Sequence, residues 1–227
     1  RQQGLLGWLG QAQDRAGLRA DALATWLRFH VQGAANRMSL PPVSPPPAHW
    51  PALGDVPESA PMTMFLVGAP GSGVERLAAV FAACAEQFQG DRLGTRPPHD
   101  GFQDPAAIEA LAAGRLSGET LVAQWRAALP ARGVQDGHVI DWLPWWDNAF
   151  LHGLRPYVRE GMVMMAVRDP RDMLLEWLAF GSAMPFAMPE PNRAAGWLAI
   201  VLNQMALLVE EQWYPNRVVR TDEVGND

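Results

Sequence analysis

The chain has 227 residues, of which 48% are hydrophobic and 19% charged, so it can bury a full core and is not disordered in composition. A net charge of -6 without a basic stripe argues against nucleic acid as a partner. No apolar run approaches the ~18 residues of a membrane span, and no signal-peptide pattern is present. These features predict a soluble, cytoplasmic protein without membrane contacts. The single cysteine, Cys84, has helical spacing with neighbouring apolar residues, which predicts core packing.

The first 40 residues predict a helical segment. Two helices are expected between Leu5 and His30, with a break at Gly17. Small and aromatic residues in this stretch follow the spacing of a tetratricopeptide repeat: Leu6, Leu9, Gly10, Gly17, Ala22 and Trp26. A plain helical hairpin is the alternative. Residues 41–60 form a proline-rich linker or strap, since eight prolines between Pro41 and Pro61 forbid helix and favour extended backbone.

Apolar runs alternate with helical patterns over residues 61–227. Strands are expected at 62–67, 138–141, 162–167 and 217–220, and helices include 74–88 and 192–213. This alternation predicts an α/β domain with a parallel β-sheet flanked by helices. Ligands of such sheets bind at the carboxyl ends of the strands.

Two strand-to-turn junctions predict anion binding at that edge. Residues 68–73, Gly-Ala-Pro-Gly-Ser-Gly, follow the first apolar run, and residues 168–172, Arg-Asp-Pro-Arg-Asp, follow a later one. Backbone N–H groups of a glycine-rich loop and an arginine fork both suit phosphate, so a ligand with two phosphates is expected. A Walker A loop is a weaker alternative, because Val74 and Glu75 stand where a P-loop NTPase or kinase needs lysine and a hydroxyl. A plain strand-to-helix turn is the remaining alternative.

Both junctions resemble motifs of the sulfotransferase family. Residues 67–77, Val-Gly-Ala-Pro-Gly-Ser-Gly-Val-Glu-Arg-Leu, resemble its P-loop-like 5′-phosphosulfate loop, and residues 167–177, Val-Arg-Asp-Pro-Arg-Asp-Met-Leu-Leu-Glu-Trp, resemble its 3′-phosphate motif. The repeat-like start is similar to a bacterial branch in which tetratricopeptide repeats precede a domain related to protein-tyrosine sulfotransferases. The resemblance covers residues 61–227, whose end looks interrupted.

The resemblance implies 3′-phosphoadenosine 5′-phosphosulfate (PAPS) as cosubstrate, and transfer of its sulfuryl group to a hydroxyl or amine of an acceptor, with a protein or peptide as one candidate. It implies no metal. Its cofactor-binding positions fall on Gly68, Gly71, Ser72, Gly73 and Val74 for the 5′-phosphate, and on Arg168 and Glu176 for the 3′-phosphate. Asp172 is expected to cap the helix after the second motif, and Arg171 to pair locally.

Several positions depart from the family pattern. Gly71 replaces a lysine or arginine, Val74 and Glu75 replace two hydroxyl residues, Glu176 replaces a serine, and Trp142 replaces a lysine. A carboxylate ~4 Å from a bound phosphate disfavours its binding by ~1 to 4 kcal/mol of charge repulsion. The first hypothesis is an active transferase in which Arg76, Arg92 or Arg171 supplies the missing cation. The alternative is a catalytically degenerate domain that acts as a binding or interaction module.

The catalytic candidates are Asp91 as base and Arg92 as replacement cation. A solvated surface pair is the alternative interpretation of these two residues. His99 and His138 are further possible bases without a partner in the sequence, and no metal-ligand spacing is present. A tryptophan cluster between Asp141 and Asp147 predicts either an acceptor platform or packing across the sheet edge: Trp142, Trp145 and Trp146.

Overall fold

A five-stranded, fully parallel sheet forms the centre of the protein in a computed structural model, which describes residues 2–37, 39–93, 98–102, 105–134, 137–144, 146–180, 188 and 190–223. The strand order is β2-β3-β1-β4-β5. The strands are β1 (Met62–Gly68), β2 (Phe88–Gln89), β3 (His138–Trp142), β4 (Arg159–Val167) and β5 (Asn216–Arg220). The predicted α/β class with a parallel sheet flanked by helices is therefore confirmed.

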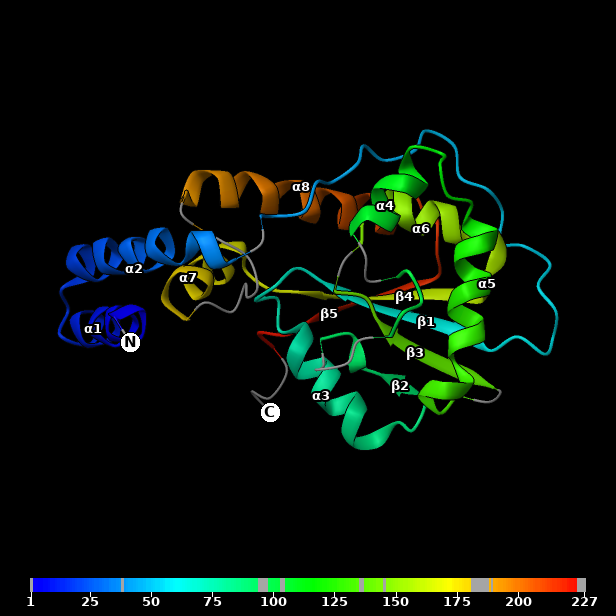
Figure 1. Cartoon of the computed structure of the whole chain (residues 1–227), viewed down its shortest axis with the longest axis horizontal. Coiled ribbons are helices and arrows are strands. Elements are labelled where there is room, and N and C mark those ends of the chain that lie inside the picture. The colour runs from blue at the N-terminus through cyan, green and yellow to red at the C-terminus, as the bar shows by residue number, and fades with distance from the viewer. Residues whose placement is uncertain are drawn as a thin grey trace.

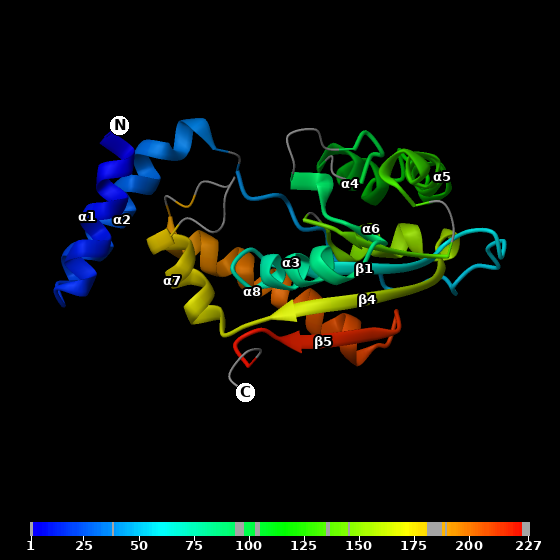
Figure 2. The ribbon, with the colours of Figure 1, turned by 90° about the horizontal axis from the view of Figure 1, so that it is seen from below.

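Helices cover the two faces of the sheet unequally (Figures 1 and 2). One face carries α3 (Val74–Cys84), and the other carries α4 (Pro105–Ala112), α5 (Gly118–Ala128), α6 (Asn148–Leu154) and α8 (Pro191–Glu210). Alternate strand residues divide between them: Phe65 and Val67 join the large core under α5, α6 and α8, whereas Leu66 packs with Val74 and Ala78 of α3. This alternation follows the period of two along a strand.

The first two helices form an antiparallel hairpin at one end of the molecule (Figure 1). They are α1 (Gln2–Arg15) and α2 (Arg19–Gly33), and Gly17 between them has φ +78°, a conformation that favours glycine. Gly10 leaves room for the indole of Trp26, since a Cβ at position 10 would lie 2.2 Å from its Nε1. The hairpin packs on α7 (Pro170–Phe180), where Ala22 and Trp26 meet Ala179.

The proline-rich segment after the hairpin lies against the helices of the large-core face. Trp197 on α8 donates from Nε1 to the carbonyl oxygen of Pro41 at 2.9 Å. Gln204 donates to the Ser44 carbonyl at 2.7 Å, and Ser44 N–H donates to the Asp147 carboxylate at 2.9 Å. Because both backbone groups of Ser44 are held by side chains, the segment is a strap fixed to α8 and to the start of α6.

Two predicted details of the α3 region are wrong. The helix expected over 74–88 ends at Cys84, and the chain then forms the short edge strand β2. Cys84 is exposed and not part of the core. It lies at the last residue of α3, away from the residues of this helix that pack on the sheet, Val74 and Ala78, so helical spacing did not translate into burial.

Candidate functional site

The glycine loop connects the central strand β1 to α3, at the carboxyl edge of the sheet. Ser72 N–H donates to the Ala69 carbonyl at 3.0 Å, and Gly71 between them has φ +76°. With Pro70 at the second position, this is the pattern of a type II turn. Gly73, at φ +81°, is the N-cap residue of α3 and makes no side-chain cap. The loop thus leads directly into a helix N-terminus.

The turn uses one of the N–H groups that were predicted to bind a phosphate and leaves two others at the start of α3. The N–H of Ser72 closes the turn. Contrary to the prediction, it is therefore not available to a phosphate. The N–H groups of Gly73 and Val74 stand at the start of α3, where a helix has no internal acceptor for them. Gly68 is buried beneath the turn, and its Cα lies close to the Ser72 hydroxyl, because a Cβ there would be 2.5 Å from that Oγ. Ser72 Oγ is buried with no hydrogen-bond partner among the described residues.

Arg168 comes directly after β4, the parallel neighbour of β1. The register pairs Gly68 with Ala166, which places both junctions side by side at one sheet edge. Arg168 Nη1 lies 3.5 Å from the Gly71 carbonyl oxygen, so the arginine reaches the loop itself. The sequence therefore correctly predicted that the two motifs meet.

The Arg168 guanidinium is paired with the carboxylate of Glu176, two turns along α7. Both side chains remain partly open to solvent, with 25% and 30% of their surfaces exposed. Here the chain supplies its own anion to the arginine.

A second carboxylate stands at the loop, on the first turn of α3. Desolvation beside the loop raises the pKa of Glu75, and the negative charge of Glu176 adds to the rise. The N–H groups of Glu75 and Gly71 and the charge of Arg76 act in the opposite direction. Part of the Glu75 surface remains open to solvent. Glu75 thus lies near the N–H groups that a 5′-phosphate would need.

Side chains from α7 and the end of β5 hold the loop in place. Trp177 donates from Nε1 to the Pro70 carbonyl at 2.6 Å, and Thr221 donates from Oγ1 to the Ser72 carbonyl. A Cβ at Gly71 would meet the Trp177 indole at 2.8 Å. Positions 71 and 73 therefore require glycine both for their backbone angles and for these close contacts.

The loop side that faces the strap is filled. A cavity of about 20 Å³ remains there, enough for one water molecule, lined by Pro41, Gly68, Ala69, Pro70, Pro144, Trp146, Trp197 and Val201. Of the predicted tryptophan platform, Trp146 packs against the large core and Trp142 packs on the α3 side of the sheet. The two side chains lie on different faces, so they do not form one platform; Trp145 lies outside the described residues. Asp147 caps α6 by accepting from Phe150 N–H at 2.7 Å.

The predicted catalytic pair has a structural role instead. Arg92 is 1% exposed and donates to Asp100 at 2.8 Å twice and to Asp141 at 2.8 and 2.6 Å. Asp91 pairs with Arg132 at 2.6 Å, not with Arg92. The interpretation as a solvated surface pair is therefore wrong for Arg92. The guanidinium of Arg92 is enclosed by the carboxylates of Asp100 and Asp141.

Asp141, at the end of β3, is the centre of this network. Arg92, Arg132 and the Trp125 indole N–H all donate to its carboxylate, the last at 2.7 Å. Burial alone would raise the pKa of Asp141, but the two arginines outweigh it and lower the pKa. The network ties β3 to α5, to the short 3-10 helices that carry Arg92 and Arg132, and to the loop at Asp100. Sequence reasoning missed it because its hydrogen bonds join residues up to 49 positions apart.

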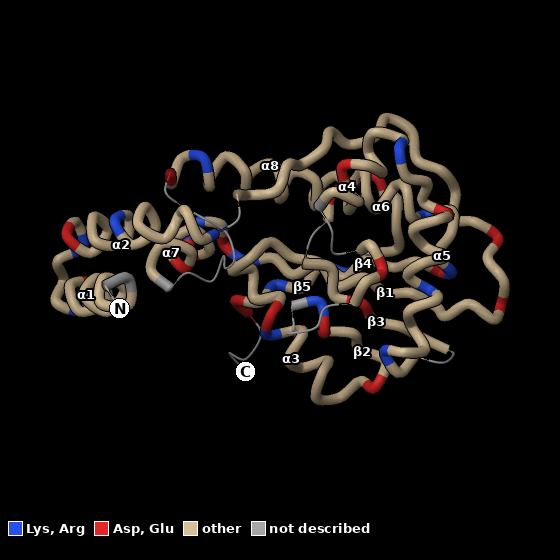
Figure 3. The backbone as a smooth tube through the Cα atoms, in the orientation of Figure 1, with Lys and Arg blue, Asp and Glu red and all other residues tan. Residues whose placement is uncertain are grey.

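The other candidate cations also fail to fill the loop. The chain contains no lysine, since all 18 basic residues are arginines. Arg171 is 88% exposed and pairs with Asp169 at 2.5 Å, as the expected local pair. Asp169 also accepts the Arg171 N–H at 2.8 Å, so it caps α7 in place of Asp172. Arg76 is exposed on α3 beside Glu75. Figure 3 shows both signs of charge at this edge instead of a basic patch.

No protein-family model matches the sequence, and no curated protein matches it either. Among the described residues, no cluster of three or more His, Cys, Asp or Glu side chains could hold a metal ion. None of the helices in the described part of the chain is long and apolar enough to cross a membrane.

Proposed function

We propose that the carboxyl edge of the sheet binds a nucleotide with a 3′-phosphate, in the manner of a PAPS-dependent sulfotransferase. The observation that carries the proposal is the approach of Arg168 to the Gly71 carbonyl at 3.5 Å, which joins the two phosphate-type junctions at adjacent parallel strands. The N–H groups at the start of α3 and the helix dipole favour an anion at the same edge. The reaction would transfer a sulfuryl group to a hydroxyl or amine.

The ligand must displace Glu176 from Arg168. Both groups are partly exposed, so the pair exchanges with solvent and costs little to open, about 0 to 1 kcal/mol for an exposed ion pair. Once free, the planar guanidinium can accept a phosphate through two parallel hydrogen bonds. The carboxylate of Glu176 would then remain beside the bound phosphate and weaken its binding by charge repulsion.

Isothermal titration with 3′-phosphoadenosine 5′-phosphate tests the proposal. Wild-type protein should show saturable binding, and Arg168→Ala should weaken it at least tenfold, whereas Arg193→Ala on an exposed face of α8 should leave it unchanged. Glu176→Ser removes the competing charge and restores the family residue, so it should tighten binding about tenfold, equal to ~1.4 kcal/mol. Glu210→Ser is the matched control for that substitution.

A second candidate function is a degenerate domain that serves as an interaction module. The Arg168–Glu176 pair and the position of Glu75 favour it, because a carboxylate of the chain itself stands at each expected phosphate position. Absence of binding at millimolar nucleotide, in wild type and in Glu176→Ser alike, would overturn the first proposal and support this one. Magnesium-dependent ATP binding would instead support a P-loop NTPase or kinase.

A further inference from the structure

A separate cavity lies on the sheet at the end opposite the glycine loop. It has a volume of about 550 Å³, within the range of small-molecule sites, and it is lined by Met62, Thr63, Met64, Gln87, His138, Val139, Ile140, Glu160 and Met162. β1 runs from the cavity at Met62 to the loop at Gly68, a distance of ~20 Å at the rise of a strand. The inference below is therefore independent of the proposed function.

The cavity exists because the α3 face is covered over only part of its length. Strand residues near the carboxyl edge, Leu66 and Ala166, are buried under Val74 and Ala78 of α3. Toward the amino ends, the side chains of Met62, Met64 and Met162 are only partly buried. Parallel sheets normally have both faces covered, so this is an unusual opening.

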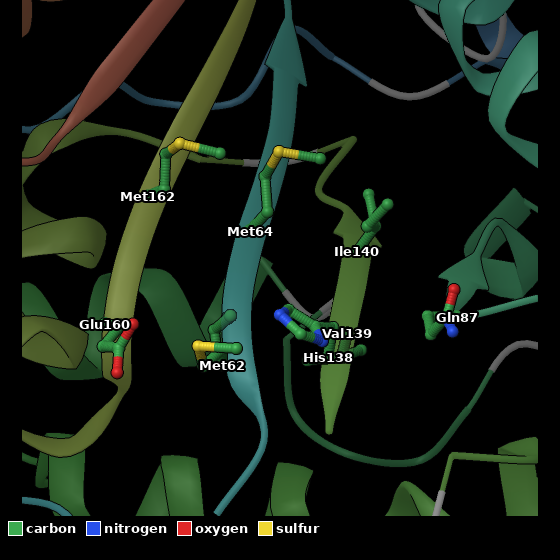
Figure 4. A pocket seen from close by; sticks show the side chains of 9 residues that line it. Met62, Met64, Gln87, His138, Val139, Ile140, Glu160 and Met162 are labelled. Carbon is green, nitrogen blue, oxygen red and sulfur yellow. The ribbon is translucent and has the colours of Figure 1, made fainter. Parts of the chain in front are cut away.

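Methionines make the floor of the cavity adaptable. Figure 4 shows Met64, Met162 and Ile140 side by side across three strands, with Met62 nearer the amino end of β1. Unbranched thioether side chains rearrange at low cost and accept apolar groups of different shape. The floor thus suits the apolar body of a ligand and does not specify one rigid outline.

Glu160 brings a charge to one end of this floor, through an irregular backbone. It has φ +45°, which is uncommon for a residue with a side chain, and it lies where the register of β1 and β4 shifts between Met62 and Met64. A bulge of this kind re-aims a side chain. Figure 4 shows the result: the carboxylate of Glu160 lies at the same end of the cavity as His138, with Met62 between them.

The carboxylate is available to a ligand. Its side chain is 63% exposed, and its ion pair with Arg159 is long, at 3.7 Å, so an incoming ammonium group can approach the carboxylate from solvent. Arg159 Nη1 also donates to the carbonyl oxygens of Glu58 and Ala60, and Arg159 is not among the residues that line the cavity. Glu160 is thus the only acidic or basic group, apart from the His138 imidazole, among the nine lining residues.

We propose that this cavity binds a small amine with an apolar body, the ammonium group on Glu160 and the apolar part on the three methionines. An anionic ligand of the same shape is disfavoured, because its head group would lie beside the Glu160 carboxylate. The proposed ligands are therefore alkylammonium or arylalkylammonium compounds.

Titration of the full chain with hexylamine, hexanol and hexanoate tests the inference, because the three probes share one apolar chain and differ in charge. Hexylamine should bind at least tenfold more tightly than hexanoate, with hexanol between them. Glu160→Gln should reduce the preference for hexylamine to less than twofold, whereas Glu211→Gln, at an exposed site directly after α8 that does not line the cavity, should preserve it. Met64→Trp should fill the floor and weaken all three probes.

Equal binding of hexylamine and hexanoate, or a preference that survives Glu160→Gln, would overturn the proposal. So would absence of binding for all three probes. Glu160 is exposed, so its substitution keeps the test valid even where Met64→Trp fails to fold, and circular dichroism identifies that case. Nucleotide titration of Glu160→Gln should match wild type, which separates this site from the edge that carries Arg168.

Discussion

The imidazole of His30 on α2 donates a hydrogen bond from Nε2 to the carbonyl oxygen of Leu178 on α7, at 3.0 Å. Its other nitrogen, Nδ1, accepts from Arg37 at 3.2 Å, so both ring nitrogens of the neutral form are used. The ring is fully buried. Since α7 also carries Glu176 and Trp177, this bond fixes the hairpin to the helix that contacts the glycine loop.

The buried His30 predicts a loss of stability in mild acid. Desolvation and the charge of Arg37 lower its pKa in the folded protein below 6.5. The unfolded chain then binds a proton that the folded protein does not, so this contribution is complete above about pH 6.5 and is lost as the pH falls from there through the lower pKa of the folded protein. Urea unfolding between pH 7.5 and 5.5 should show a decline of up to ~1.4 kcal/mol per pH unit from this group.

His30→Gln should flatten that decline, because glutamine does not titrate. His99→Gln, which alters an exposed imidazole, is the matched control and should retain it. A wild-type stability that is constant over this range would contradict the assignment.

The contact between Gly10 and Trp26 predicts opposite effects for two similar substitutions in α1. Gly10→Ala places a methyl group against the buried indole and should destabilise the protein by about 1–3 kcal/mol. Gly7→Ala has nothing within 4 Å of the new Cβ and should stabilise α1 by about 0.5–1 kcal/mol. Thermal unfolding of both variants tests this prediction. Equal shifts of their Tm relative to wild type would show that the hairpin is not packed in this way.

The carboxylate of Asp141 predicts a large cost for a nearly isosteric change. Asp141→Asn leaves Arg92 buried with one fewer counter-charge, and it should destabilise the protein by about 3–5 kcal/mol in urea unfolding at pH 7. Asp55→Asn, in an exposed part of the strap, should change stability by less than about 0.5 kcal/mol.

The same carboxylate predicts how that difference depends on pH. The pKa of Asp141 is lowered in the folded protein, so its stabilisation is complete above its unfolded value of ~3.9 and is lost as the pH falls through the folded value. The difference between wild type and Asp141→Asn should therefore narrow only below about pH 4. Narrowing that begins near neutral pH would contradict this assignment.

Asp147 joins the strap to α6, which predicts two effects of Asp147→Ala. The variant loses the N-cap of α6 and the acceptor for Ser44 N–H, so its stability should fall by about 1–2 kcal/mol. Limited proteolysis should also cut residues 41–60 faster than in wild type, because the strap has lost one of its anchors. Asp147→Asn keeps a capping oxygen, so its stability and its rate of proteolysis should lie between those of wild type and Asp147→Ala.

Sequence patterns predicted the parts of the fold that depend on local apolar runs. β1, β3, β4 and β5 each contain a predicted strand, and the two junctions lie on neighbouring strands as expected. β2 was missed because its two residues carry no period, and Arg92 was misread because a charged residue is normally exposed. A signal was nevertheless present: Asp141 interrupts an apolar strand, and a buried carboxylate requires a cationic partner.

The position of Glu176 could be aligned with the phosphate motif, but its contact could not be predicted. The pair with Arg168 depends on the eight-residue separation across the start of α7 and on the side-chain directions there. The methionine cavity was also outside the reach of the sequence, because it depends on where α3 ends relative to three strands.

The strand order β2-β3-β1-β4-β5 also has a consequence for biosynthesis. Of the five strands, β1 is synthesised first. It pairs with β3, which begins at His138, and with β4, which begins at Arg159. Until residue 167 has been synthesised, the strand that bears the glycine loop has an unpaired, apolar edge. Parallel pairing across such separations is slow, and exposed edges recruit other chains. Assembly of the loop is therefore a late event in folding, and nascent chains that stop before β4 are the species most prone to aggregate.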